Sequence, residues 1–320
     1  MFLPIKADFK LPAWPILTVL VCLVCVAVFL KQESDWREFS LSIDRYCAKP
    51  QSHLTQMIMT RVETLQHADF CGEVMYHLSQ SENEAAEITD IAALIKPLSG
   101  FSAADSREYV AQMLTDELRY FRSIVKDDPG NNYAYNTESW NAWRMILSSF
   151  AHGSWGHIIF NLIFFFAFAA TVEALIGPVA FFLFIIINSL AIGVTDSVVS
   201  ELVSNHHWTL GLSGVVMGMM GLFAYLLPRG KIRCYYWLII FIGSIALPGW
   251  MLALWYIGGD VLRLMSSDDH GAINVLAHVV GGISGFLYGL FFLKGSRMLA
   301  ASLQRDMDKG TLRPDGTAFR

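Results

Sequence analysis

The second half of the chain is almost continuously apolar. Between Met145 and Leu293, long runs of Leu, Ile, Val, Phe, Ala and Gly are separated only by short polar links. A helix needs about 20 apolar residues to cross the hydrocarbon core of a bilayer. These runs are too long and too close together for the core of a soluble all-α domain. We therefore expect an integral multi-pass membrane protein.

The composition supports this interpretation and excludes other classes. Charged residues are 16% of the 320 residues and hydrophobic residues are 54%, whereas a soluble domain carries about 25% charged residues. The formal net charge of −5 leaves no basic surface for nucleic acid. The lipid bilayer is the predicted partner of most of the surface.

Hydropathy predicts an all-α membrane protein with six transmembrane helices. The spans are expected at about residues 12–30, 155–172, 179–199, 212–227, 235–257 and 273–293. The first apolar run could instead be a cleaved signal peptide. It is longer than the usual 7–15-residue apolar region of such peptides, and no A-x-A-like site follows it before Lys31, so a retained helix is favoured.

Lysine and arginine mark one side of the membrane. They form three clusters. Lys6 and Lys10 precede the first span, and Arg229, Lys231 and Arg233 lie between the fourth and fifth spans. The third cluster follows the sixth span and consists of Lys294, Arg297, Arg305, Lys309 and Arg313. With six spans all three lie on the same side, which should be the cytoplasm. We expect a bacterial inner membrane.

Four segments follow from this topology. Residues 1–30 hold the cytoplasmic N-terminus and the first helix, 31–141 form an extracytoplasmic insert, 142–294 form a core of five helices, and 295–320 form a cytoplasmic tail. The insert carries 18 acidic and 10 basic residues, a balance that fits translocation.

The insert is predicted to be mostly helical. Apolar residues recur at helical spacing in two stretches, which are Leu54, Ile58, Val62 and Leu65, and then Val110, Leu114, Leu118 and Phe121. Cys47 and Cys71 are the two cysteines placed outside the membrane, where an oxidising compartment would let them pair. Two free thiols remain the alternative, since sequence does not show their separation.

Polar groups inside apolar spans are costly, so they mark candidate chemistry. Ser213 lies near the outer start of the fourth span, and His278 lies at a similar depth in the sixth. A serine hydroxyl becomes a nucleophile when a base such as neutral imidazole removes its proton. We expect a Ser–His dyad rather than a triad, because we place no acidic residue in the neighbouring helical segments.

Glycines predict that the fourth and sixth helices touch. Gly214, Gly218 and Gly221 recur along the fourth, and Gly281, Gly285 and Gly289 along the sixth. Small residues at such spacing let helix backbones approach closely in lipid. This packing would bring the Ser213 hydroxyl near the His278 imidazole. The alternative is that these glycines serve only to let the helices pack, with no role in a catalytic site.

The second span carries a further polar face. His157 and Asn161 are four residues apart and share one side of the helix, and His152 precedes them. Such donors could hold the oxyanion of a tetrahedral intermediate. They could equally be polar contacts between helices.

Together these motifs resemble the rhomboid family of intramembrane serine proteases. The matching pieces occur in the family's order: Trp143-Arg144, His152, His157-x-x-x-Asn161, Glu173, Gly211-Leu212-Ser213-Gly214, and Ala277-His278-x-x-Gly281-x-x-x-Gly285. The resemblance implies a six-helix rhomboid-like bundle with 142–294 as the catalytic core. It also implies that Trp143, Arg144 and Glu173 are structural.

The resemblance implies a role for each site residue. Ser213 would be the nucleophile and His278 the general base. The backbone N–H groups of Leu212 and Ser213, with His157 and Asn161, would form the oxyanion hole. His152, Gly211, Gly214, Gly281 and Gly285 would support the site. Substrates would be transmembrane proteins, reached past the fifth helix, where Pro248-Gly249 suggests a bend.

Two rival functions stay open. An inactive rhomboid-like protein would bind transmembrane clients without cutting them, although it would be expected to lack the nucleophile or the base. A small-molecule transporter would use the intramembrane His and Asn, but the sequence shows no inverted repeat. No cofactor is expected, and no metal, because no ligand set is visible. The insert of about 110 residues departs from the family's short first outer loop.

Overall fold

The computed structural model describes residues 2–8, 14–48, 70–81, 83–238, 241–265 and 272–308. The contacts divide the chain into two compact units, which we describe separately. The membrane unit is Met1–Gln32 with Tyr133–Arg320, and the insert unit is Glu33–Asn132. The insert is therefore shorter than the expected 31–141, since residues 133–141 pack with the membrane unit.

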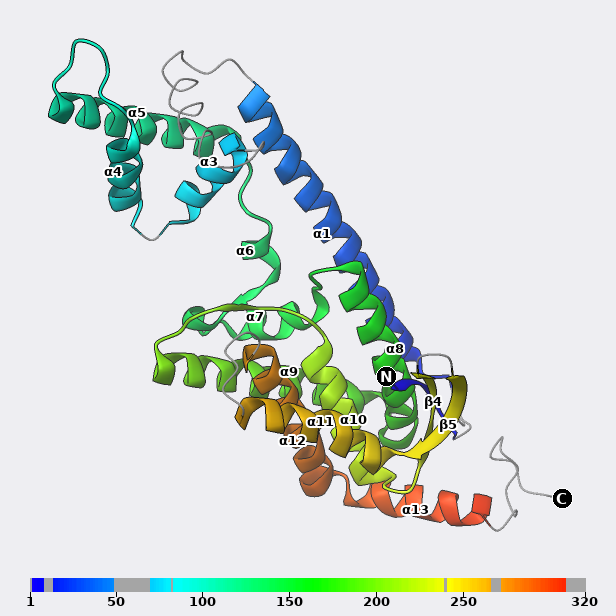
Figure 1. Ribbon diagram of the computed structural model, residues 1–320. Helices are drawn as coiled ribbons and strands as arrows, with labels where there is room; N and C mark the ends of the chain where they lie inside the picture. Colours follow the sequence, from blue (N-terminus) through cyan, green and yellow to red (C-terminus); the bar gives the residue numbers. More distant parts are fainter. Residues whose placement is uncertain are drawn as a thin grey trace. The chain divides into compact units, whose positions relative to one another are not determined.

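Helices form most of the membrane unit (Figure 1). They are the first part of α1 (Ile16–Ala48), then α6 (Gly130–Tyr133) at the boundary, α7 (Ala142–Leu147), α8 (Trp155–Ile176), α9 (Pro178–Val203), α10 (Ser213–Leu226), α11 (Gly249–Met265), α12 (Ala272–Phe292) and α13 (Lys294–Asp308), with 3₁₀ turns η1 (Thr137–Ser139) and η2 (Ser148–Phe150). Among the described helices, α1, α8, α9 and residues Val275–Phe292 of α12 are long and apolar enough to cross a membrane.

Helix α10 is the centre of the membrane unit. It contacts α8, α9, α11 and α12, and nearly all its side chains are buried. A helix that is apolar all round belongs in such a position. Its 14 residues span only about 21 Å at 1.5 Å per residue, less than a bilayer core. Helix α10 is therefore too short to cross a bilayer core by itself.

The predicted fifth span at 235–257 is wrong in its first half. Residues Lys231–Leu238 form strand β4 and Phe241–Pro248 form β5, an antiparallel pair, and β4 also pairs with β1 (Phe2–Ala7). The run is rich in Ile, Tyr and Trp, which favour strands, and an apolar run of this kind does not distinguish strand from helix. Pro248 and Gly249 mark the junction of β5 with α11 rather than a bend inside a helix.

Hydrogen bonds from α1 to Glu173 connect α1 to α8. The Glu173 carboxylate accepts hydrogen bonds from the backbone N–H groups of Leu17 and Thr18 at 2.9 and 2.7 Å, and from the Thr18 hydroxyl. The first N–H groups of a helix have no acceptor within it, and a negative charge there is favourable. Glu173, at the C-terminal end of α8, thus caps the start of α1.

The insert unit is an α-helical domain with its own core. Its helices are the second part of α1, α3 (Phe70–Gln80), α4 (Glu84–Leu94) and α5 (Ala103–Ile124). Residues Val110, Leu114, Leu118 and Phe121 are buried along α5, as their spacing predicts. The matching stretch Leu54 to Leu65 lies outside the described residues. The Sγ atoms of Cys47 and Cys71 are bonded, with their Cα atoms 6.0 Å apart.

Candidate active site

Ser213 begins α10, and the residues before it determine its position. Gly211 has a φ of +124°, a conformation that residues with a side chain rarely adopt. A Cβ at Gly211 would also lie 2.7–2.8 Å from ring atoms of His157. The Gly211 N–H donates to the Ser148 carbonyl at 2.9 Å. Glycine is therefore needed here, and it lets the turn before Ser213 pass directly against His157.

A short sheet holds the start of this turn. Strand β2 (Tyr135–Asn136) pairs with β3 (Trp208–Thr209), which lies just before the turn. The Tyr135 hydroxyl also contacts the Ser197 hydroxyl on α9. The segment that leads to Ser213 is therefore anchored to residues 135–136 and, through Tyr135, to α9.

Helices α10 and α12 meet backbone to backbone. A Cβ at Gly281 would collide with the Gly214 carbonyl, and one at Gly285 would collide with the Gly218 carbonyl. The Ala277 carbonyl likewise lies 3.2 Å from the Cβ position of Gly214. Because Ala277 precedes His278 and Gly214 follows Ser213, the two site residues lie at the same level of adjacent helices.

A buried carboxylate holds the imidazole of His278. The Asp260 Oδ2 atom on α11 lies 2.8 Å from His278 Nδ1, and Asp260 is only 8% exposed. Among the described residues, no hydrogen bond joins Ser213 to His278; catalytic hydrogen bonds often tighten only once substrate binds. The expectation that no acidic residue lies in the neighbouring helical segments is wrong.

Helix α8 places the other predicted residues around the turn. His157 contacts Gly211 as described, and its Nδ1 accepts from the Gly153 N–H at 3.4 Å. Asn161 is buried, and its Nδ2 has no hydrogen-bond partner in the described part of the chain. A buried amide donor without an acceptor is unusual in a folded protein. The Asn161 Nδ2 group could therefore donate a hydrogen bond to a bound group.

His152 lies behind His157 in the loop before α8. Its backbone N–H donates to the Gln32 side-chain oxygen at 3.0 Å, and its ring lies 5.1 Å from the His157 ring, centroid to centroid. Burial lowers the pKa of His152 to about 4, with a smaller contribution from His157. His152 is therefore neutral at pH 7.

A small cavity of about 30 Å³ opens beside Ser213. Its wall includes Ser213, Ala277, Tyr135 and Asp196. Asp196 lies on α9 and is 1% exposed, and neither of its oxygens has a hydrogen-bond partner in the described residues. A buried acid is therefore among the residues around this cavity.

Sequence reasoning overlooked both intramembrane acids. Asp196 lies inside the predicted third span, so the cost of a charge in lipid was already a signal for it. Asp260 fell just beyond the predicted fifth span because the helix was started too early, in what is a β-hairpin. With the fifth helix placed correctly, Asp260 is an isolated acid in an apolar helix. His278 on the next helix would then have been its natural partner.

Two more predicted residues lie on the short helix that precedes α8. Trp143 and Arg144 are on α7, and Trp143 is 74% exposed. The Met145 side chain of the same helix packs on Gly193 of α9. This places α7 against α9.

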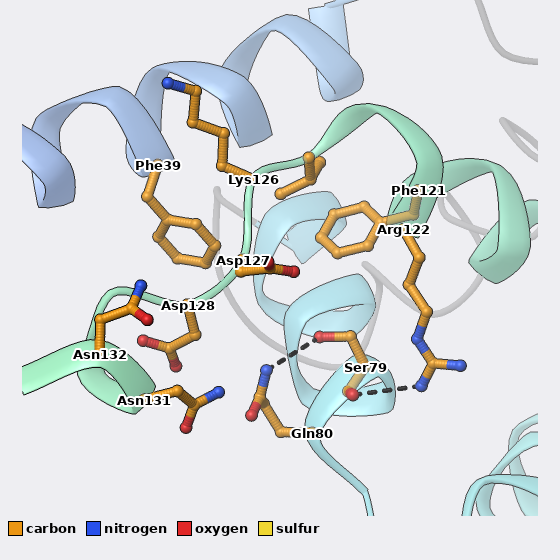
Figure 2. Close-up of a pocket in the computed structure, with 11 residues that line it drawn as sticks. Phe39, Ser79, Gln80, Phe121, Arg122, Lys126, Asp127, Asp128, Asn131 and Asn132 are labelled. Atoms are coloured by element: carbon orange, nitrogen blue, oxygen red, sulfur yellow. Dashed lines mark hydrogen bonds between the residues drawn. The ribbon is translucent and has the colours of Figure 1, made fainter. Parts of the chain in front are cut away.

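The insert unit holds a larger pocket of about 460 Å³ (Figure 2). Arg122 in its wall donates to the Ser79 carbonyl and pairs with Glu84. Asp128 accepts from the Tyr76 hydroxyl. Several of its charged groups are thus already partnered within the insert, which gives the pocket no clear preference for one class of ligand.

The fold and the site agree with a family of membrane proteins. Residues 139–295 match the family model of the rhomboid domain, so this part of the chain is a rhomboid domain. With its apolar helices, it is an integral membrane protein.

Named relatives support the assignment at modest identity. The chain is 27% identical to Rhomboid protein 1, mitochondrial, of Saccharomyces cerevisiae, over 47% of this chain and 42% of the yeast protein. It is also 27% identical to rhomboid protease GlpG of Haemophilus influenzae, over 56% of this chain and 83% of that protein. The chain thus spans less than half of the yeast relative.

Proposed function

We propose that this protein is an intramembrane serine endopeptidase that cleaves transmembrane proteins. The observation that carries the proposal is the position of Ser213 on the first turn of α10, at the level where α12 presents His278. The family match and the two relatives named as rhomboid proteins support it.

The first half-reaction is acylation. The Ser213 Oγ attacks the scissile carbonyl carbon, and His278 takes the hydroxyl proton. The carbonyl oxygen becomes an oxyanion, which would accept hydrogen bonds from the N–H groups of Leu212 and Ser213 and from His157 and Asn161. The imidazolium then gives its proton to the amine as the C–N bond breaks, which leaves an acyl-enzyme.

The second half-reaction is hydrolysis of the acyl-enzyme. Water attacks the ester with His278 again as base, which releases the acid and restores Ser213. This step needs water below the membrane surface. A short α10 and a polar cavity beside Ser213 fit that need, because irregular backbone at membrane depth is tolerated where it lines a cavity.

The decisive test is cleavage of a model transmembrane substrate by purified protein in liposomes. Ser213→Ala and His278→Ala should each remove cleavage to background, because the two residues act as a unit. Ser284→Ala removes a hydroxyl elsewhere in the bundle, on α12, and should stay active. If Ser213→Ala cleaves at the wild-type rate, the proposed nucleophile is wrong.

A serine-directed fluorophosphonate probe separates the rival functions. A protease should be labelled at Ser213, and His278→Ala should lose the label. An inactive client-binding protein or a transporter should not react at Ser213. An unlabelled wild type that still binds a transmembrane peptide would favour the client-binding alternative.

We also propose that the insert and the Ser213 end of α10 face outward from a bacterial inner membrane. The basic clusters gather at the other end of the membrane unit: Lys6 on β1 pairs in register with Arg233 on β4, and Arg297 of α13 lies over the ring of Tyr225 near the end of α10. Basic residues at one end indicate the cytoplasmic side.

Cysteine labelling tests this orientation. In a background lacking Cys22, Cys25 and Cys234, Ser102→Cys should react with an impermeant maleimide in intact cells. Ala301→Cys, exposed on α13, should react only after permeabilisation. The opposite pattern would contradict the orientation.

A further inference from the structure

Three helices converge on His278. Ser213 lies on α10 and His278 on α12, and the His278 Nδ1 atom is 2.8 Å from a carboxylate oxygen of Asp260 on α11. Asp260 is buried, with Arg263 one turn further along at 3.9 Å from its other oxygen. The acid therefore faces the proposed base rather than the lipid.

The packing of α11 on α12 brings this pair together. Gly282 lies one turn after His278, and Ile257 lies about one turn before Asp260. The Ile257 side chain occupies the space that a Cβ at Gly282 would need. The helices therefore run antiparallel in close contact, with the Asp260–His278 and Ile257–Gly282 contacts in one register.

The placement of Asp260 has a chemical consequence. A carboxylate on Nδ1 keeps a proton on that nitrogen, so the lone pair of the neutral ring lies on Nε2. Only this tautomer could accept the Ser213 proton through Nε2. The same carboxylate would stabilise the imidazolium once it forms, as the acid does in serine protease triads of other folds.

We propose that Asp260 is a positioning residue that completes a Ser213–His278–Asp260 triad across α10, α12 and α11. This inference rests on the proposed function. During acylation the Ser213 proton moves to Nε2 while the Nδ1 proton stays in its hydrogen bond to Asp260. When the C–N bond breaks, the Nε2 proton passes to the leaving amine. Asp260 stays ionised throughout, so no proton is lost or gained.

The alternative role for Asp260 is a polar contact that only holds α11 to α12. The two roles make different predictions for substitution by Asn. Asp260→Asn keeps the shape and a hydrogen bond, so a purely structural contact would survive. For a triad it is harmful, because the amide can donate to Nδ1 and leave the proton on Nε2, where the ring cannot accept from Ser213.

The test compares turnover of a model transmembrane substrate in liposomes. Asp260→Asn should lower kcat by roughly two to four orders of magnitude, as loss of the correct tautomer does in a serine protease triad, with little change in KM. Asp260→Glu, which restores a carboxylate, should recover part of the rate. Leu262→Ala, at an exposed position on the same helix, is the matched control and should stay near wild type.

A spectroscopic measurement on the unmodified protein is independent of how the variants fold. Histidine labelled with ¹⁵N, assigned by comparison with His278→Gln, should show the proton of neutral His278 on Nδ1. Asp260→Asn should move it to Nε2. A wild-type proton on Nε2 would overturn the triad.

The outcomes separate the two proposals. If the wild type cleaves and Ser213→Ala does not, while Asp260→Asn keeps kcat within threefold or raises it, the triad is wrong and the protease survives. If the wild type neither cleaves nor labels with fluorophosphonate, the proposed function itself fails.

Discussion

The two units of this chain are stabilised by different means. The membrane unit depends on close backbone contacts between glycine-bearing helices, and several of its buried polar groups join one helix to another or cap a helix. The insert unit has an apolar core behind a charged surface, with exposed ion pairs and a bond between Cys47 and Cys71. In lipid, helices gain little by hiding apolar surface from one another, so close fit is decisive; in water, burial of apolar surface dominates.

The strongest test of this contrast compares two glycines. Gly281→Ala would drive a Cβ into the Gly214 carbonyl, and backbone cannot move aside cheaply. We expect a loss of about 3 kcal/mol or more in the free energy of unfolding, with loss of substrate cleavage. Thermal unfolding in detergent and the liposome assay measure both.

The matched control lies in the insert. Gly72→Ala would meet a side-chain methyl, the Cγ2 of Ile43, rather than backbone, and it removes a helical glycine. Its effect should be within about 1 kcal/mol. Equal losses for the two variants would contradict the contrast.

The disulfide provides the next test. Cys47→Ser should destabilise the insert by roughly 3 kcal/mol, since the bond closes a loop 24 residues long in sequence. Limited proteolysis should cut residues 33–132 faster in the variant than in wild type. Wild type treated with reductant should be cut as fast as the variant.

Cleavage of a small transmembrane substrate should change little, because the membrane unit has its own packing. Mass spectrometry after alkylation without reductant reports the bond directly. If both cysteines are fully alkylated in protein from an oxidising compartment, the disulfide is refuted. If Cys47→Ser loses cleavage, the insert is coupled to the site.

A smaller effect should follow from pH. Burial lowers the pKa of His152 from 6.5 to about 4, so the unfolded chain binds a proton that the folded chain does not between those values. Stability is therefore retained above pH 6.5 and lost as the pH falls toward 4. From pH 7 to pH 5 the loss attributable to His152 is about 2 kcal/mol.

Thermal unfolding of wild type and His152→Gln across this range isolates that contribution. The variant should show a shallower dependence on pH. Parallel curves would mean that His152 does not titrate as its burial indicates.

The smallest effect is expected for an ion pair of the insert. Arg122 and Glu84 lie 2.8 Å apart but are half-exposed, so a double-mutant cycle should give less than about 1 kcal/mol. The coupling should shrink further in high salt. A coupling free energy that is large and independent of salt would show that this pair is shielded from solvent, like the buried polar groups of the membrane unit.

Much of the architecture could be predicted from the sequence. The apolar runs correctly placed α8, α9 and α12, because a long apolar segment has few options besides a membrane helix. The i, i+4 spacing of residues such as Leu114 and Leu118 correctly indicated the buried face of α5. These are local properties, set by helical periodicity within one segment.

Only the tertiary structure decided the rest. Residues 231–238 and 241–248 are strands because β4 also pairs with Phe2–Ala7, more than 220 positions away, and no local pattern encodes such a partner. Asp260 meets His278 because the register of α11 on α12 is set by contacts such as Ile257 on Gly282. Apolar periodicity determines that a helix forms and which residues are buried; which polar groups meet depends on how the helices are shifted and rotated against each other.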